Sequence, residues 1–148
     1  MITVEVDIRT SASRRQPELV VAAHRLVSRT AQAVAVRARF YAPEDTGKLR
    51  DRIQPRQTEQ VSQHRVEAIV EADTFYAVWQ HEGTGIYGPH GTRIVPRRAQ
   101  FLRFYWKKVG AVVAYRSVRG TPGTKYLIKG VRDVCKDKFW DITYFTNF

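Results

Sequence analysis

The feature that most constrains this chain is a long run of apolar residues at helical spacing between residues 18 and 41. They recur at three- and four-residue steps: Leu19, Ala23, Leu26, Val27, Thr30, Val34 and Ala38. This spacing predicts one amphipathic helix of about six turns. Pro43 should end it, because proline supplies no N–H and pushes the preceding residue out of the helical region. We therefore expect a fold organised around one long helix.

The rest of the chain predicts strands and one further helix. Strict alternation over 2–9 and a looser alternation over 65–72 are typical of half-buried strands, and we expect another strand over 49–58. Residues 101–118 predict a hairpin that turns at residues 107–110. A second amphipathic helix is expected over 125–139, with its stripe formed by Leu127, Ile128, Val131, Val134 and Cys135. The fold class is therefore α+β, with a long N-terminal and a shorter C-terminal helix packed on a mostly antiparallel sheet.

The length of 148 residues is most simply one domain. We assign it to residues 1–139, followed by an aromatic tail at 140–148, which we expect to dock on the body or on a neighbour. The Gly- and Pro-rich loop at 83–96 is longer than compact domains usually need, so it is either disordered or functional.

The tripeptide Asp45-Thr46-Gly47 has two interpretations. It is the sequence that carries the catalytic aspartate of aspartic proteases, where it lies between buried strands and works with a second carboxylate. Here it follows a helix and a proline, and a turn explains each residue: Asp45 can accept backbone N–H groups, and Gly47 can supply a positive φ. We interpret the tripeptide as a turn.

Other catalytic or ligand-binding patterns lack the context that their chemistry requires. Gly83, Gly85 and Gly88 have dinucleotide-motif spacing, but Pro89 and polar residues follow them instead of a helix start. His81-Glu82 lacks the second histidine of a zinc-binding helix motif. We therefore expect no catalytic residue, no metal site and no cofactor. Cys135, the single cysteine, is expected to be a small buried residue.

The net charge of +11 indicates an anionic partner, and a solvated basic face is the alternative. Residues 93–138 hold 13 Lys/Arg against 2 acidic residues, with aromatics interleaved. A basic and aromatic sheet can bind single strands by stacking, although strand alternation places at least half of these aromatics in the core. The candidates to face DNA are Arg93, Arg97, Arg98, Arg103, Lys107 and Lys108.

No membrane association is expected. Residues 1–15 show no apolar run or cleavage pattern of a signal peptide. No window approaches the roughly 18 apolar residues that a membrane-spanning helix requires.

Three segments, YAPEDTGKLRDRI (41–53), FYAVWQHEGTGIYGP (75–89) and RGTPGTKYL (119–127), together resemble a known family. The chain is similar to the head–tail joining proteins of long-tailed bacteriophages, also called neck or tail-completion proteins. The similarity spans about two-thirds of the chain, and Asp51-Arg52 replaces a small polar residue of the family pattern. The matching positions are Ala42, Pro43, Asp45, Thr46, Gly47, Leu49, Arg50, Tyr76, Ala77, Glu82, Gly83, Thr84, Tyr126 and Leu127.

The resemblance implies no enzymatic activity. It implies a sixfold ring of identical subunits in the virion, assembled in the host cytoplasm, that joins the DNA-filled head to the tail. Its partners would be other copies of itself, neighbouring neck and tail proteins, and double-stranded genomic DNA in the bore. The alternative function is non-specific nucleic-acid binding through residues 93–138.

Residues 82–84 open a loop that we expect to become ordered only against a neighbour, and Arg50 is a candidate to pair with Glu82. The remaining candidates for contacts between subunits are drawn from the matching segments and the tail: Tyr76, Glu82, Gly83, Thr84, Tyr126, Leu127, Trp140, Tyr144, Phe145 and Phe148.

Overall fold

The computed structural model describes residues 2–9, 17–62, 65–135 and 141–146. Its contacts group the chain into two compact units. Unit 1 comprises Met1–Val78 and Lys125–Phe148, and unit 2 comprises Trp79–Thr124. The elements confirm the predicted α+β class, with a long N-terminal helix, a shorter C-terminal helix and antiparallel sheets. The division into units describes contacts within the chain, so the prediction of one domain over 1–139 stays a prediction.

Helix α1 (Pro17–Tyr41) is the long helix that the apolar spacing predicts. Its buried face consists of Ala23, Val27, Thr30, Ala31, Val34, Ala35 and Ala38. Leu26, expected in that stripe, is 53% exposed. The reason is angular: Leu26 precedes Val27 by one residue, which rotates its side chain about 100° away from the buried face.

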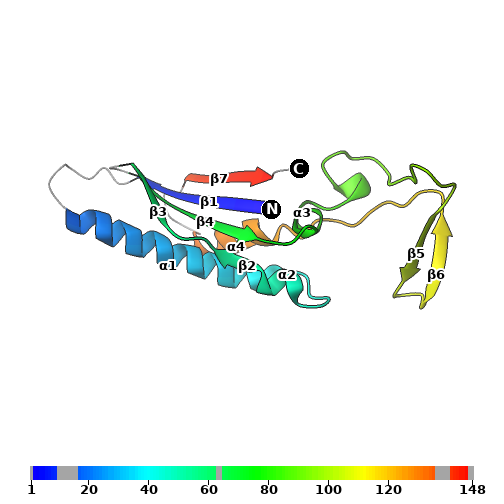
Figure 1. Ribbon diagram of the computed structural model, residues 1–148, viewed down its shortest axis with the longest axis horizontal. Helices are drawn as coiled ribbons and strands as arrows, with labels where there is room; N and C mark the ends of the chain where they lie inside the picture. The colour runs from blue at the N-terminus through cyan, green and yellow to red at the C-terminus, as the bar shows by residue number, and fades with distance from the viewer. Residues whose placement is uncertain (1, 10–16, 63–64, 136–140, 147–148) are drawn as a thin grey trace. The chain divides into compact units, whose positions relative to one another are not determined.

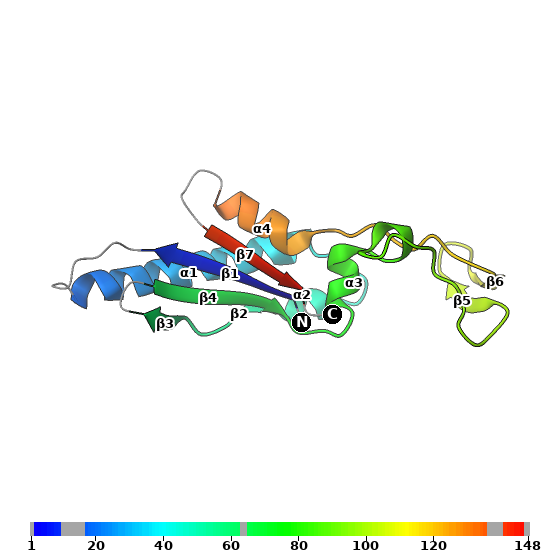
Figure 2. The ribbon, with the colours of Figure 1, turned by 90° about the horizontal axis from the view of Figure 1, so that it is seen from above.

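The main sheet has five strands in unit 1: β1 (Ile2–Arg9), β2 (Ile53–Pro55), β3 (Glu59–Ser62), β4 (Arg65–Ala72) and β7 (Asp141–Thr146). The order is β2-β4-β1-β7, β3 also pairs with β4, and every pairing is antiparallel. Helices α1 and α4 lie on the same face of this sheet (Figures 1 and 2). The predicted strands at 2–9 and 65–72 are confirmed.

One prediction for unit 1 needs correction. The strand expected over 49–58 is a short helix, α2 (Lys48–Asp51), followed by β2. Leu49 and Ile53, four residues apart, are both buried, so a helical turn brings both to the core. The segment at 140–148 was expected to dock on the body or on a neighbour; it contains β7, which docks on the body by pairing with β1 at Val4↔Tyr144.

Helix α4 (Tyr126–Val134) packs on α1 and is shorter than the predicted 125–139. Tyr126, Leu127 and Val131 are buried between this helix, α1 and the sheet. At one edge of the contact, the Tyr41 hydroxyl donates to Oδ2 of Asp133 over 2.6 Å. This hydrogen bond raises the pKa of Tyr41, and partial burial and the charge of Asp133 add to the increase. The two helices are thus joined by apolar packing and one polar contact.

Helix α3 (Ala77–Glu82) begins in unit 1, and its last turn belongs to unit 2. Unit 2 continues through a 3-10 turn, η1 (Gly85–Tyr87), to a two-stranded hairpin of β5 (Leu102–Trp106) and β6 (Ala111–Tyr115). The hairpin was predicted, including its turn at 107–110. The segments before and after it, residues 80–94 and 117–124, are joined by hydrogen bonds, and we call them the strap.

Candidate functional site

The Asp45-Thr46-Gly47 segment is a turn between α1 and α2. Gly47 has φ 79°, the left-handed conformation predicted for it. It immediately precedes α2, which delivers Leu49 to the core at 3% exposure. Asp45 is exposed and connects two helices, unlike a protease aspartate between buried strands. The segment thus positions Leu49 in the core and Arg50 at the surface, where Arg50 Nη1 lies 2.9 Å from Glu44 Oε2.

A hollow of about 510 Å³ in unit 1 is lined by residues of the first two segments that resemble the phage family, 41–53 and 75–89. Lys48 and Asp51 come from the first segment, and Phe75 and Tyr76 come from the second. Phe75 is 83% exposed and packs edge-on against Tyr76, with ring centroids 5.2 Å apart. Tyr76 is partly buried against the core, so it is fixed in place while the adjacent ring remains open to contact.

The strap brings the second and third family-like segments together in unit 2. The backbone N–H of Thr84 donates to the Thr121 carbonyl over 2.8 Å, and the Thr121 N–H donates to Thr84 Oγ1 over 2.9 Å. Ile86 N–H donates to the Arg119 carbonyl over 2.9 Å. Thr84 therefore holds both segments through its backbone and its side chain.

The prediction that residues 82–84 order only against a neighbour is therefore wrong. These residues are ordered by partners in the same chain, and η1 forms within the loop at 83–96. The sequence predicts a loop over 83–96 because each half of the strap is too irregular to show strand alternation.

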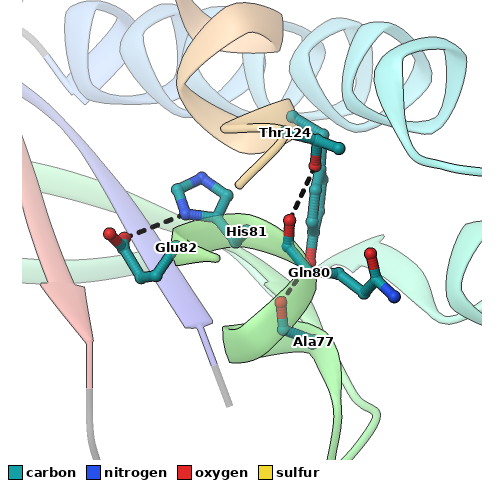
Figure 3. Close-up of polar contacts among 6 residues, drawn as sticks. Ala77, Gln80, His81, Glu82 and Thr124 are labelled. Atoms are coloured by element: carbon teal, nitrogen blue, oxygen red, sulfur yellow. Dashed lines mark hydrogen bonds and ion pairs between the residues drawn. The ribbon is translucent and has the colours of Figure 1, made fainter. Parts of the chain in front are cut away.

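A polar group at the end of α3 fixes the start of the strap (Figure 3). His81 is fully buried, and its Nδ1 lies 3.0 Å from Glu82 Oε1. Since a carboxylate only accepts, His81 donates this hydrogen bond. Thr124 donates to the Gln80 carbonyl through its N–H and its hydroxyl, each over 2.9 Å. The first half of the strap thus begins in the last turn of α3, and the second half ends at Thr124, which is hydrogen-bonded to that turn.

The other contact candidates from the sequence fall into different positions. Tyr126 and Leu127 are fully buried, which argues for packing within the chain rather than contact with a neighbour. Burial raises the pKa of Tyr126 strongly, and its hydroxyl lies 3.5 Å from the Ala77 carbonyl. Gly83 is also buried. Tyr144 and Phe145 belong to β7, whereas Trp140 and Phe148 lie outside the described residues.

The hairpin presents its aromatic side chains to solvent. The expectation that at least half of the aromatics near it are core residues is wrong for this chain, because each is at least 40% exposed. They are Phe101, Phe104, Tyr105, Trp106 and Tyr115. The six cations proposed to face DNA are exposed as well, and all belong to unit 2. The sequence had suggested this basic and aromatic character but not its exposure.

A second apolar surface lies on the outer side of α1 and was missed from the sequence. Leu26, Val36 and Phe40 are 53%, 60% and 73% exposed and lie outside the buried stripe. The sequence does contain a pattern that indicates this surface, because the apolar residues Leu26, Ala33, Val36 and Phe40 recur at helical spacing. Arg25, Arg29 and Arg37 occur along the same stretch and made the outer side look polar.

Among the described residues, no group of three or more His, Cys, Asp or Glu side chains is placed to hold a metal ion. In the same residues, no helix has the length and apolar character needed to cross a bilayer. The glycines at 83, 85 and 88 follow α3 rather than a strand, unlike a dinucleotide-binding turn. Burial raises the pKa of the Cys135 thiol, as expected for a cysteine packed against the core.

Comparisons of the chain with protein-family models, curated proteins and solved structures find no match.

Proposed function

We propose that this protein is a structural subunit of a bacteriophage neck, forming a ring that joins the DNA-filled head to the tail. The observation that carries the proposal is that one chain exposes large apolar side chains on separate surfaces. These are the outer side of α1, the hollow beside Phe75, and the hairpin of unit 2. Soluble monomers rarely expose apolar patches of this kind without a partner.

A ring of identical subunits requires two different surfaces on each subunit, because its contacts are head-to-tail rather than self-paired. The apolar surfaces of unit 1 and unit 2 differ in their chemistry and fit that requirement. Leu26, Val36 and Phe40 form an aliphatic and aromatic strip on a rigid helix, whereas the hairpin is aromatic and basic. In the ring that we propose, both are covered by neighbours.

The family-like segments support the proposal in a second way. In the structure they form a turn, a hollow and a strap. Gly47 and Leu49 fix the start of α2, and Thr84 ties the strap together. A family of structural proteins is expected to share residues that maintain the fold, and Gly47, Leu49 and Thr84 are residues of this kind.

The test is an amber mutation in the gene within the phage that encodes it, with lysates examined by negative-stain electron microscopy. Under the proposal, filled heads and finished tails lie apart, and suppression of the amber codon restores joined particles. Intact, infectious particles without suppression would overturn it.

A variant of the outer side of α1 gives a sharper form of the same experiment. Val36→Glu with Phe40→Glu places two charges on the exposed side while leaving the buried stripe untouched. The proposal predicts unjoined heads and tails with this variant. Gln32→Glu with Arg25→Gln, at exposed polar positions of the same helix, makes the same change of −2 in charge and is the control for it. Joining that survives the first variant would exclude the α1 surface from the ring contact.

A further inference from the structure

Unit 2 carries most of the net charge of the protein. Residues 79–124 hold eight Lys/Arg and one acidic residue, a net +7 of the total of +11. All eight cations are exposed, whereas the acidic residue, Glu82, is largely covered and accepts a hydrogen bond from His81. The accessible surface of unit 2 is therefore basic with no acidic side chain to offset it, which is the electrostatic complement of a polyanion.

The hairpin within this basic unit has one aromatic face. The pairing Phe104↔Val113 and Leu102↔Tyr115 places these side chains on the same side of the ladder, because directly opposed residues share a face. The ring centroids of Phe104 and Tyr115 lie 6.3 Å apart, and those of Trp106 and Tyr115 lie 6.4 Å apart. Each of the three side chains is about 40% exposed.

No core within unit 2 covers this face. Every residue of unit 2 is described, and only His81 and Gly83 in it are buried. Because the rings of Phe104, Trp106 and Tyr115 are each about 40% exposed, they are available to a ligand. Cations stand close by: Lys107 and Lys108 form the turn, and Arg116 lies 5.8 Å from the Phe101 ring centroid.

From this juxtaposition we propose that the β5–β6 hairpin binds single-stranded nucleic acid. Unpaired bases stack on Phe104, Trp106 and Tyr115, and phosphates are bound by the surrounding lysines and arginines. Stacking on aromatic side chains accepts any base, so binding is independent of sequence. A duplex offers its phosphates but keeps its bases stacked inside, so it uses only the cations. The proposal concerns the free subunit, whose hairpin no neighbour covers, and it depends on unit 2 alone, so it holds or fails independently of the neck assignment.

The probe is a fluorescently labelled 15-nucleotide oligothymidine, with a duplex of equal length for comparison. Anisotropy titrations of the full-length protein between 50 and 200 mM salt give the affinities. We expect tighter binding of the single strand. For each phosphate neutralised, the logarithm of its binding constant should fall by roughly 0.7 for every tenfold rise in salt concentration.

Variants separate the roles of rings and charges. Phe104→Ala with Tyr115→Ala should weaken binding of the single strand by about tenfold or more and leave duplex binding unchanged. Phe40→Ala with Phe75→Ala, which removes two exposed rings from unit 1, is the matched control and should have no effect. Phe104→Leu with Tyr115→Leu keeps the hairpin apolar while removing the rings, so a loss seen with it is assigned to the missing rings rather than to a lost apolar face.

Charge is tested at the turn. Lys107→Gln with Lys108→Gln should reduce the magnitude of the salt slope by about 1.4, whereas Arg25→Gln with Arg29→Gln on α1 should leave it unchanged. Absence of binding at 50 mM salt would overturn the proposal. So would unchanged single-strand binding in the leucine variant, which would indicate charge attraction alone. If the ring variants instead alter only self-association, or only binding to anionic lipid vesicles, the hairpin is a protein or membrane contact.

Discussion

Unit 1 buries one set of apolar side chains between α1, α4 and the sheet, whereas unit 2 is held by backbone hydrogen bonds and buries only His81 and Gly83. The difference follows from size and composition. Unit 2 has 46 residues, eight of them cationic, and a segment this small rarely builds a sufficient core. Unit 1 is therefore expected to determine the stability of the fold, and unit 2 to provide a surface for partners.

The largest expected effect tests this comparison directly. Leu127→Ala removes a fully buried side chain from unit 1 and should lower the free energy of unfolding by about 3 kcal/mol. Trp106→Ala removes a larger side chain from the hairpin, yet should cost less than about 1 kcal/mol because its contacts are few and exposed. Urea denaturation of both variants gives the two values. Equal losses would mean that unit 2 has a core of its own.

The next effect tests whether close backbone packing at Gly85 holds the two halves of the strap together. Gly85 has φ 64°, and a Cβ there would overlap the Arg119 carbonyl, so Gly85→Ala should force the two halves apart. We expect protection of the Thr84 and Ile86 amides from hydrogen exchange to fall by about thirtyfold or more, with the urea midpoint little changed. Gly91→Ala is the control, because Gly91 has φ 61° but open space around its Cβ position. A similar loss of protection in both variants would assign the effect to backbone strain alone.

A smaller effect is expected at the turn between α1 and α2. Gly47→Val places a β-branched residue at φ 79° and should lower the free energy of unfolding by about 2 kcal/mol. The nearest side-chain atom to a Cβ there is Asp51 Oδ2 at 3.8 Å, so the loss comes from the backbone and not from a clash. Gly47→Asn should lose much less, since asparagine tolerates this conformation. Unchanged thermal midpoints for Val would contradict the turn.

The smallest effect concerns the polar contact between α1 and α4. Tyr41→Phe removes the hydroxyl that donates to Asp133 and should lower the thermal midpoint by about 2 °C near pH 7. The hydrogen bond raises the folded-state pKa of Tyr41 above its ordinary value of 10.0. Its contribution is therefore fully present below pH 10.0 and is lost as the pH rises through the higher folded-state value.

Thermal melts of the wild type and Tyr41→Phe across this range provide the measurement. The difference between them should shrink only on the alkaline side. A difference that is constant to strongly alkaline pH would indicate that the lost ring contacts, not the hydrogen bond, cause it.

The fold was largely predictable because its main elements repeat regularly. α1, β1, β4 and the hairpin each show a period that follows from which side chains meet the core or the opposite strand. Short or irregular elements were not predictable in the same way. The sequence does not predict the helical turn of α2, because four residues are too few to show a period; this turn places Leu49 in the core.

The candidate site was predictable in composition but not in exposure. Cations and aromatics between residues 93 and 119 were visible in the sequence, and their alternation along a strand suggested that half would be covered. Covering one face of a strand requires a third element, and no pattern in the sequence shows whether one is present. Likewise, the strap joins residues about 37 apart, and the hydrogen bond from Thr121 to Thr84 leaves no local signal.

The sequence by itself determined the long helix ended at Pro43, the turn at Gly47, the antiparallel hairpin and the basic charge of the C-terminal third. These are local properties, set by side-chain period, backbone sterics and charge. Only the tertiary structure decided that β7 joins β1, that His81 is buried, and that the aromatic face of the hairpin and the outer side of α1 remain open. Those outcomes depend on which distant segments come together. Such contacts are determined by the free energy of the whole fold and not by the properties of any one segment.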